Sequence, residues 1–273
     1  MIQDLITYPF LLKALLGALS LAILCGFLSP MIVAKRFAFM GASISHGALL
    51  GVSLAMVFID STDHGAALFL ITLAVTLLGV APLAYATFRQ KLPNDALIGL
   101  FFTATMGLGL IINQVWGGAQ GDLLSFLFGN ILTLENFDLG LLFFLCLSII
   151  PLILIRRRTW MLFLFDEEAC AIQGINTALY HGTLFFFLTL VIVSGLKISG
   201  VILINSFLLT PGIFALKWAP NATRTFSYSL GFSVVSTLVG FFLANRFDLP
   251  TGATLAVVQV LSYFISHLLK RNP

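Results

Sequence analysis

Charged residues are scarce in this chain. Of its 273 residues only 9% are Asp, Glu, Lys or Arg, whereas soluble domains average about 25%. A soluble domain with so little charge would leave long apolar runs facing water, so the composition excludes a water-soluble enzyme, a disordered chain and a secreted disulfide scaffold. Cysteine is also rare: the three residues Cys25, Cys146 and Cys170 are unclustered, which argues against disulfides and paired-cysteine metal motifs. The formal net charge of +3 is too small to indicate nucleic acid as a partner.

The sequence also lacks the common nucleotide and hydrolase motifs. It has no G-x-x-x-x-G-K-[ST] phosphate loop, no HExxH and no GxSxG. We therefore expect a protein that is not an enzyme, has no ATP-binding motif of its own and holds no tightly bound cofactor.

What the chain does have is hydrophobicity: 59% of its residues are hydrophobic, and the mean hydropathy is +1.07. About 20 apolar residues cross a hydrocarbon core as a helix, and the charges divide the sequence into pieces near that length. We predict an all-α integral membrane protein, a polytopic bundle of about eight or nine transmembrane helices in one domain, 1–273. The predicted spans are 12–33, 38–59, 66–88, 96–115, 137–155, 180–196, 198–216, 226–245 and 252–269.

Two places need a separate interpretation. The spans 180–196 and 198–216 are too long together for one bilayer crossing, so we predict a tight hairpin around 197–200. The stretch 122–134 is apolar but too short to cross, which favours a re-entrant or surface helix.

Basic residues indicate the orientation, because cytoplasmic loops carry an excess of Lys and Arg. Nine alternating spans place eleven basic residues on one side and three on the other, so we predict an outer N-terminus and a cytoplasmic C-terminus. The same topology places most acidic residues on the outer side. They would either concentrate cations there electrostatically or merely lack the bias toward one side that basic residues show. The eleven are Lys35, Arg36, Arg89, Lys91, Arg156, Arg157, Arg158, Lys217, Arg224, Lys270 and Arg271; the three are Lys13, Lys197 and Arg246.

His46 is the ionisable side chain that the pattern places well inside a span. Ser43 and Ser53 share its helical face. Ionisable residues within membranes are costly and mark transport pathways by default, and imidazole is a ligand for transition metals. The alternative is a neutral histidine that bonds to a neighbouring helix.

Small residues and one proline give further patterns. The sets Gly99, Thr103, Gly107 and Ser229, Ser233, Ser236, Gly240 favour close helix packing over a pore lining. Pro211 has no N–H for the carbonyl of Phe207, so we predict a kink or opening there that could serve as a gate, although many membrane prolines only bend a helix.

The stretch 166–174 is predicted to be a short helix. Asp166, Glu167 and Glu168 occupy its first turn, where acids complement the helix dipole, and Gly174 can end it. On the predicted cytoplasmic side, such a helix suggests a docking site for a partner; an isolated interfacial helix is the alternative.

Several motifs follow one another in a specific order. Met40-Gly41 and Ser45-His46-Gly47-Ala48 resemble a "GDAxSHA" helix, and 165–175 resembles a "DxExAxxxGI" segment. The others are a basic turn at 34–37, a pattern over 95–109, an "LFGxxL" piece at 127–130, a "GxLLxxAxLxxPA" helix at 200–211 and a "DxPSG" turn at 248–252. Together they resemble the ABC-3 permeases of bacterial ABC importers for zinc, manganese and iron.

The resemblance implies a homodimeric permease in the bacterial cytoplasmic (inner) membrane, in contact with lipid, that moves a divalent transition metal inward. It implies two partners, an ATPase subunit that consumes the ATP and an extracytoplasmic metal-binding protein. ATPase coupling would fall to Asp166, Glu167, Glu168 and Gly174, within a cytoplasmic segment of about 159–178. His46 would face the metal path, but the family's acid four residues earlier is Ala42 here.

That departure leaves two interpretations. Another acid compensates, with Asp122 as the candidate, or the metal preference or cargo has changed, for example to a chelated metal. Two other classes stay open: a secondary transporter driven by an ion gradient, which commonly shows inverted repeats and intramembrane acids, and a membrane scaffold or channel subunit.

Overall fold

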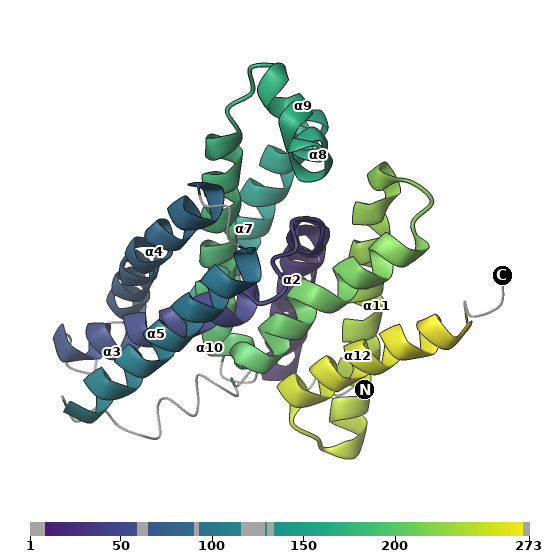
Figure 1. Ribbon diagram of the computed structural model, residues 1–273. Coiled ribbons are helices and arrows are strands. Elements are labelled where there is room, and N and C mark those ends of the chain that lie inside the picture. The colour runs from purple at the N-terminus through teal and green to yellow at the C-terminus, as the bar shows by residue number, and fades with distance from the viewer. Residues whose placement is uncertain (1–8, 59–64, 90–92, 116–128, 130–133, 270–273) are drawn as a thin grey trace. The chain divides into compact units, whose positions relative to one another are not determined.

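The helices in Figure 1 belong to a computed structural model that describes residues 9–58, 65–89, 93–115, 129 and 134–269. Within these ranges the regular structure is helical, without strands. Contacts divide the chain into two units, which we describe separately. Unit 1 comprises Met1–Val33, Leu127–Leu152 and Gly195–Pro273, and unit 2 comprises Ala34–Phe126 and Ile153–Ser194. A single domain over 1–273 stays a prediction, because a division by contacts does not define what folds independently.

Nine helical segments of the described residues are long and apolar enough to cross a membrane. They coincide with the nine predicted spans, which confirms the polytopic helical fold. The re-entrant helix predicted over 122–134 lies outside the described residues, apart from positions 129 and 134. The helices are α2 (Pro9–Ala34), α3 (Met40–Phe58), α4 (Gly65–Arg89), α5 (Asn94–Val115), α7 (Asn136–Ile155), α8 (Arg157–Phe165), α9 (Glu167–Ile172), α10 (Thr177–Trp218), α11 (Ala222–Phe247) and α12 (Thr251–Leu269).

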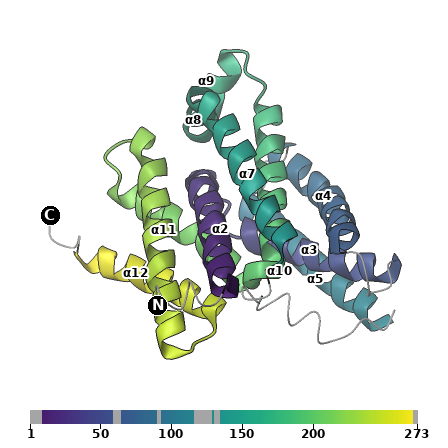
Figure 2. The same cartoon turned by 180° about the vertical axis from the view of Figure 1, so that it is seen from behind.

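In unit 1, α11 packs closely against α2, and Figure 2 shows the two helices side by side. The hydroxyl of Ser229 donates to the carbonyl of Gly26 at 2.6 Å, and that of Ser233 donates to Ala22 at 2.8 Å. Small polar side chains thus bring the two backbones together. The predicted packing role of this serine face is confirmed.

Helix α10 contains the predicted break. Gly200 has φ 70° and ψ 169°, outside the helical region, and separates two segments that can each span a membrane. The helix axis bends sharply here, because a Cβ on Gly195 would lie 3.3 Å from the Cδ1 atom of Ile204, whereas a straight helix at 1.5 Å per residue would separate the two residues by about 13 Å. Gly129, with φ 64°, lies against this turn, and a Cβ there would overlap the backbone of Ser199 and Gly200.

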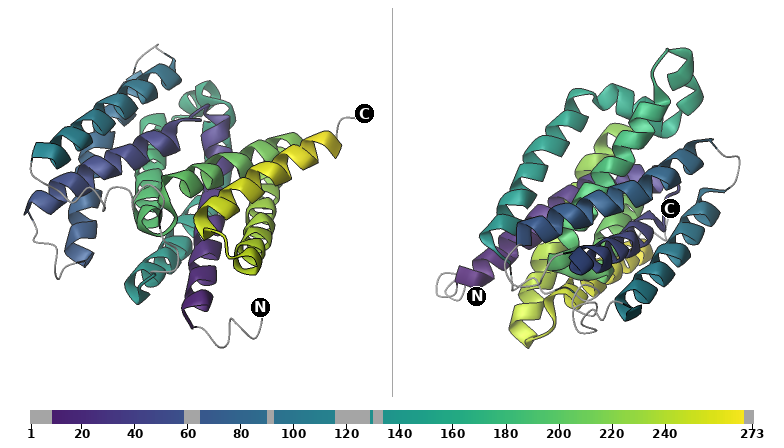
Figure 3. Two further views of the ribbon diagram at one scale, coloured as in Figure 1. Left: turned by 90° about the horizontal axis from the view of Figure 1, so that it is seen from below. Right: turned by 90° about the vertical axis from the view of Figure 1, so that its left-hand side faces the viewer.

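In unit 2, α3 contacts both α4 and α5, as Figure 3 shows. The approach to α4 is close at Gly51, where a Cβ would lie 2.8 Å from the carbonyl oxygen of Thr72. On α5, Ile98 accepts a hydrogen bond from the hydroxyl of Ser43 at 2.9 Å. These contacts fix the helix that carries His46.

One packing prediction is wrong for the part of the chain that the structure describes. A Cβ on Gly99 or on Gly107 would meet no atom within 4 Å. Thr103 is exposed and donates back to the carbonyl of Gly99 in its own helix. The spacing of small residues allows a close approach, but no described helix makes one on this face of α5.

Candidate functional site

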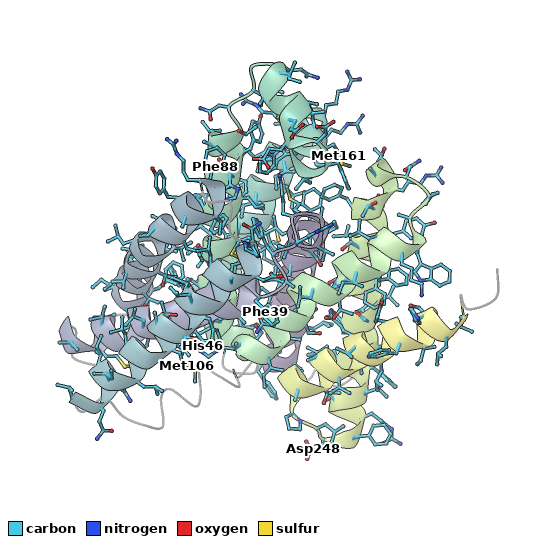
Figure 4. The ribbon with its side chains drawn as sticks, in the orientation of Figure 1. Phe39, His46, Phe88, Met106, Met161 and Asp248 are labelled. Carbon is cyan, nitrogen blue, oxygen red and sulfur yellow. The ribbon has the colours of Figure 1, made fainter. Side chains whose placement is uncertain are left out.

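His46 lies two turns into α3, and its side chain is 9% exposed. Figure 4 labels His46 on α3 and Met106 on α5, the helix that packs against α3 and also contains Phe102. The imidazole meets the ring of Phe102 edge to face, with 4.6 Å between the ring centroids. Its Nδ1 atom is buried and has no hydrogen-bond partner among the described residues. Imidazole nitrogen is a ligand for transition metals, so the metal-contacting role expected of His46 stays a prediction.

The neighbouring hydroxyl groups are occupied elsewhere. Ser43 donates to α5, and Ser53 donates to the carbonyl of Leu49 in its own helix at 2.9 Å. Both hydroxyl hydrogens are thus used elsewhere, and neither oxygen accepts a hydrogen bond from Nδ1 of His46. The alternative that the sequence left open, a neutral histidine bonded to another helix, requires a hydrogen bond that the described residues do not provide at Nδ1.

No resident metal centre is evident in the described part of the chain. It contains no group of three or more His, Cys, Asp and Glu side chains that could hold an ion. Ala42 lies one turn before His46 on the same face and has no ligating atom. Asp122, the acid proposed to compensate, lies outside the described residues. His46 thus stands without a second ligating side chain in any such group of the described residues, and its contact with a metal stays a prediction.

The second candidate region is the segment 159–178, whose local structure follows the prediction. Asp166 ends α8 and begins α9, because its Oδ1 atom accepts the N–H of Ala169 at 2.9 Å. Gly174 closes α9 with φ 71°, and the N–H of Ile175 donates to the carbonyl of Cys170 at 3.1 Å. This left-handed ending satisfies carbonyl groups that the helix leaves free.

Glu167 forms an ion pair with Lys35, with 2.7 Å between Oε2 and Nζ. Lys35 is in the turn between α2 and α3, and its ammonium group also lies 3.9 Å from the ring centroid of Phe163 on α8. The ion pair therefore connects α9 to the turn from which α3 departs. Glu168 is exposed and has no recorded partner among the described residues.

His181, which the sequence analysis did not single out, lies beneath this ion pair. It is 5% exposed, and its Nε2 atom is 3.0 Å from the hydroxyl of Thr87 on α4. The rings of Phe37, Phe88, Phe163 and Phe185 surround it. The sequence signal was a histidine in the first turn of a predicted span, close to several phenylalanines. This aromatic cluster packs against α8 through the ring of Phe163.

Three of the four predicted coupling residues therefore have structural roles. Asp166 caps a helix, Glu167 pairs with Lys35, and Gly174 ends α9. The exposed side chains of this stretch include Glu168 and Ile172, the latter 86% exposed. Burial raises the pKa of the Cys170 thiol between them, and the neighbouring Glu167 carboxylate raises it further.

Pro211 lies in the second half of α10, where the backbone dihedral angles stay helical. The break in this helix is at Gly200 instead. Next to the proline, the N–H of Gly212 donates to the hydroxyl of Ser29 on α2 at 2.7 Å. A gating role of Pro211 stays a prediction.

Comparisons with known proteins cover nearly the whole chain. A family described as "ABC 3 transport family" matches residues 7–270. The manganese transport system membrane protein MntC of Listeria innocua is 29% identical over 267 residues, covering 98% of this chain and 93% of that protein. A probable iron transport system membrane protein of Haemophilus influenzae is 30% identical over 259 residues, covering 95% and 93%.

A solved structure supports the fold. PsaBC from Streptococcus pneumoniae, in complex with Fab, superimposes with a TM-score of 0.82 at 28% identity, over 97% of this chain and 93% of that one.

Proposed function

This chain belongs to the ABC 3 transport family, and on that premise we propose that it is the permease of an ABC importer that moves a divalent transition metal into the cytoplasm. The observation that carries the proposal is the extent of the family match. It covers residues 7–270, so the described helices all lie within the matched region. The names of the relatives favour manganese or iron as cargo. Zinc stays a candidate, because imidazole is also a zinc ligand.

His46 is the proposed contact with the cargo. The support is its burial, its position on a helix fixed from two sides, and an Nδ1 atom without a partner in the described region. Ala42 supplies no carboxylate, so the site is less suited to hard cations than a carboxylate–imidazole pair would be. This predicts a preference shifted toward softer ions.

ATP is consumed by a separate ATPase subunit that docks on α8 and α9. The support is the match of 165–175 to the family segment and the rigid ends that Asp166 and Gly174 give to α9. Glu168 and Ile172 are the proposed contact residues, because they face outward while Glu167 faces Lys35. The excess of basic residues on this side supports a cytoplasmic location, with the N-terminus outside.

The remaining partners follow from the same premise. An extracytoplasmic metal-binding protein delivers the cargo, two copies of the chain form the pathway, and lipid surrounds them; nucleic acid is not a partner. The exposed apolar residues on the spans, such as Leu147 at 78% and Leu78 at 74%, suit contact with lipid or a second copy.

Uptake by purified components tests the function. The permease, the ATPase and the binding protein are reconstituted in proteoliposomes, and accumulation of radioactive manganese, iron or zinc is measured with ATP on the ATPase side. ATP-dependent accumulation of one of these metals supports the proposal. Accumulation that follows an imposed ion gradient and ignores ATP would assign the chain to the secondary transporters instead.

A further inference from the structure

Unit 2 contains a basic cavity at the start of α8, and its lining does not include the proposed ATPase contacts Glu168 and Ile172. It has a volume of about 630 Å³ and lies where the last residues of α7 meet the start of α8 and the start of α10. Three consecutive arginines, Arg156, Arg157 and Arg158, contribute to its wall, and no acidic residue does. All three side chains are exposed, and none has a recorded ion pair in the part of the chain that the structure describes.

The cavity lies at the level of a membrane surface. One candidate span ends at Ile155 and the next begins at Thr177, and the helices between them, with 9 and 6 residues, are too short to cross. The two spans therefore reach the same side of the membrane on either side of this cavity. Since the arginines directly follow the end of a candidate span, we expect them at the level of the phospholipid headgroups.

The rim of the cavity is apolar on the side of the spans. Leu154 is 49% exposed, Ile155 is 81% exposed and Leu179 is 57% exposed, although all three line the cavity. These residues are placed to contact acyl chains, while the guanidinium groups beyond them are placed to bind a phosphate. Arginine binds phosphate through paired N–H donors.

Two helix ends add to the positive potential of the cavity. Arg156 precedes α8 and makes no side-chain hydrogen bond that caps this helix, and α10 begins nearby at Thr177 with no acid in its first turn. Both helices direct the positive ends of their dipoles to this region. The charge, the apolar rim and the volume together fit one kind of occupant.

We propose that this cavity binds the headgroup of an anionic phospholipid, with its phosphate between Arg156, Arg157 and Arg158 and its acyl chains along Leu154, Ile155 and Leu179. Basic pockets between membrane helices bind such headgroups in other proteins. The site requires only that the chain spans a membrane, so it does not depend on which metal is carried.

Lipid retention by the full-length permease tests the site. The protein is purified from nanodiscs of equal parts phosphatidylglycerol and phosphatidylcholine, and bound lipids are counted by native mass spectrometry. We expect phosphatidylglycerol to be retained over phosphatidylcholine, and the double variant Arg156→Gln/Arg158→Gln to reduce this retention by about tenfold, since each arginine near an anionic surface contributes measurably.

Two further variants separate the cavity from surface charge. The matched control Arg224→Gln/Arg246→Gln removes the same number of exposed charges elsewhere and should retain phosphatidylglycerol as the wild type does. Leu179→Trp keeps every charge but fills the rim of the cavity, and should lose the lipid. Equal retention by Arg156→Gln/Arg158→Gln and the wild type, or by Leu179→Trp and the wild type, would overturn the proposal.

Competition identifies the source of the phosphate. Inorganic phosphate should not displace the bound phosphatidylglycerol, because it has no acyl chains for the apolar rim. Displacement would show a site for free phosphate and contradict a lipid site. Loss of ATPase binding by Arg156→Gln/Arg158→Gln, with lipid retention unchanged, would make the arginines a protein-docking surface and would equally contradict it.

Discussion

The hydroxyl group of Ser29 accepts the backbone N–H of Gly212 at 2.7 Å, although 183 residues separate the two in the sequence. Each residue has a proline beside it, Pro30 in α2 and Pro211 in α10. A Cβ on Gly212 would lie 2.6 Å from the carbonyl oxygen of Ser29, so the two helices touch backbone to backbone at this point. This contact therefore joins α2 and α10 directly beside Pro211.

Replacement of Ser29 by alanine should destabilise the protein. The N–H of Gly212 loses its side-chain acceptor, which typically costs about 1 kcal/mol, and thermal unfolding in detergent should show a lower Tm. Gly212→Ala should lower the Tm further, because its methyl group would overlap α2. The control is Ser148→Ala, since the hydroxyl of Ser148 bonds only to carbonyl groups of its own helix. An equal loss in Ser29→Ala and Ser148→Ala would contradict the role of the contact.

His46→Ala should reduce metal uptake by the reconstituted importer about tenfold or more, an effect in the range seen when a metal site is altered. Ala42→Asp should favour manganese over zinc, because it places a hard oxygen donor one turn from the imidazole. Uptake of both metals is measured for each variant, with His267→Ala, an exposed histidine on α12, as the control. Wild-type uptake by His46→Ala would make His46 a structural residue.

Lys35→Met should make Cys170 more reactive. The Cys170 side chain is fully buried, and its pKa is raised by burial, so alkylation at neutral pH should be slow. An ion pair of this exposure contributes up to about 1 kcal/mol, so its loss should raise the opened fraction of α9, and with it the alkylation rate, by up to about fivefold.

The direction of the change in the alkylation rate distinguishes opening of α9 from a change in the pKa of Cys170. The charge of Lys35 lowers the pKa of Cys170, so its removal alone would leave less thiolate and slow the reaction. Faster modification of Cys170, measured by mass spectrometry, therefore reports movement of α9. The swap Lys35→Glu/Glu167→Lys should restore the protection of Cys170 from alkylation. Cys25, which is buried in α2, serves as the internal reference. Unchanged or slower alkylation in Lys35→Met would mean that the ion pair does not hold α9.

The double variant Glu168→Lys/Ile172→Ser should weaken ATPase binding by about tenfold, the loss expected when an interface anchor is removed. Co-purification of the ATPase with the tagged permease measures this. Leu249→Ser, which alters another exposed apolar residue, should leave recovery unchanged. If the inserted double variant recovers the ATPase in full, the docking surface lies outside α9.

Arg157→Cys, in a chain without its three native cysteines, should react with membrane-impermeant reagents only after the cytoplasmic side is opened. Leu249→Cys should react in intact spheroplasts, because the loop after α11 is predicted to lie outside. The two labelling patterns are compared by gel shift. The reverse pattern would invert the orientation and place α9 on the outer side.

Local features of this chain were predictable from the sequence because they depend on near neighbours. Span length follows from runs of apolar residues, and the ends of α9 follow from Asp166 and Gly174 within nine positions of each other. The serine face of α11 was recognised as a packing face, although its partner α2 was not.

Contacts between distant residues were not predictable in the same way. The pairing of Glu167 with Lys35 spans 132 positions, so the sequence placed Asp166, Glu167 and Glu168 in one docking set that the structure separates. The small residues of α5 share the spacing of a packing face, but spacing alone does not determine whether another helix approaches. His181 was overlooked because its partners come from three other segments.

The hydrogen bonds from Ser229 and Ser233 to α2 also bear on how the protein is made. The two serine donors lie 203 and 211 positions after the carbonyl groups of α2 that accept from them. During synthesis α2 therefore enters the membrane long before α11 leaves the ribosome, with its packing face still unmatched. A nascent chain arrested before α11 presents that face to lipid or to the insertion machinery. Premature termination should thus yield a fragment that quality-control proteases of the membrane recognise, even though most of its spans are already in place.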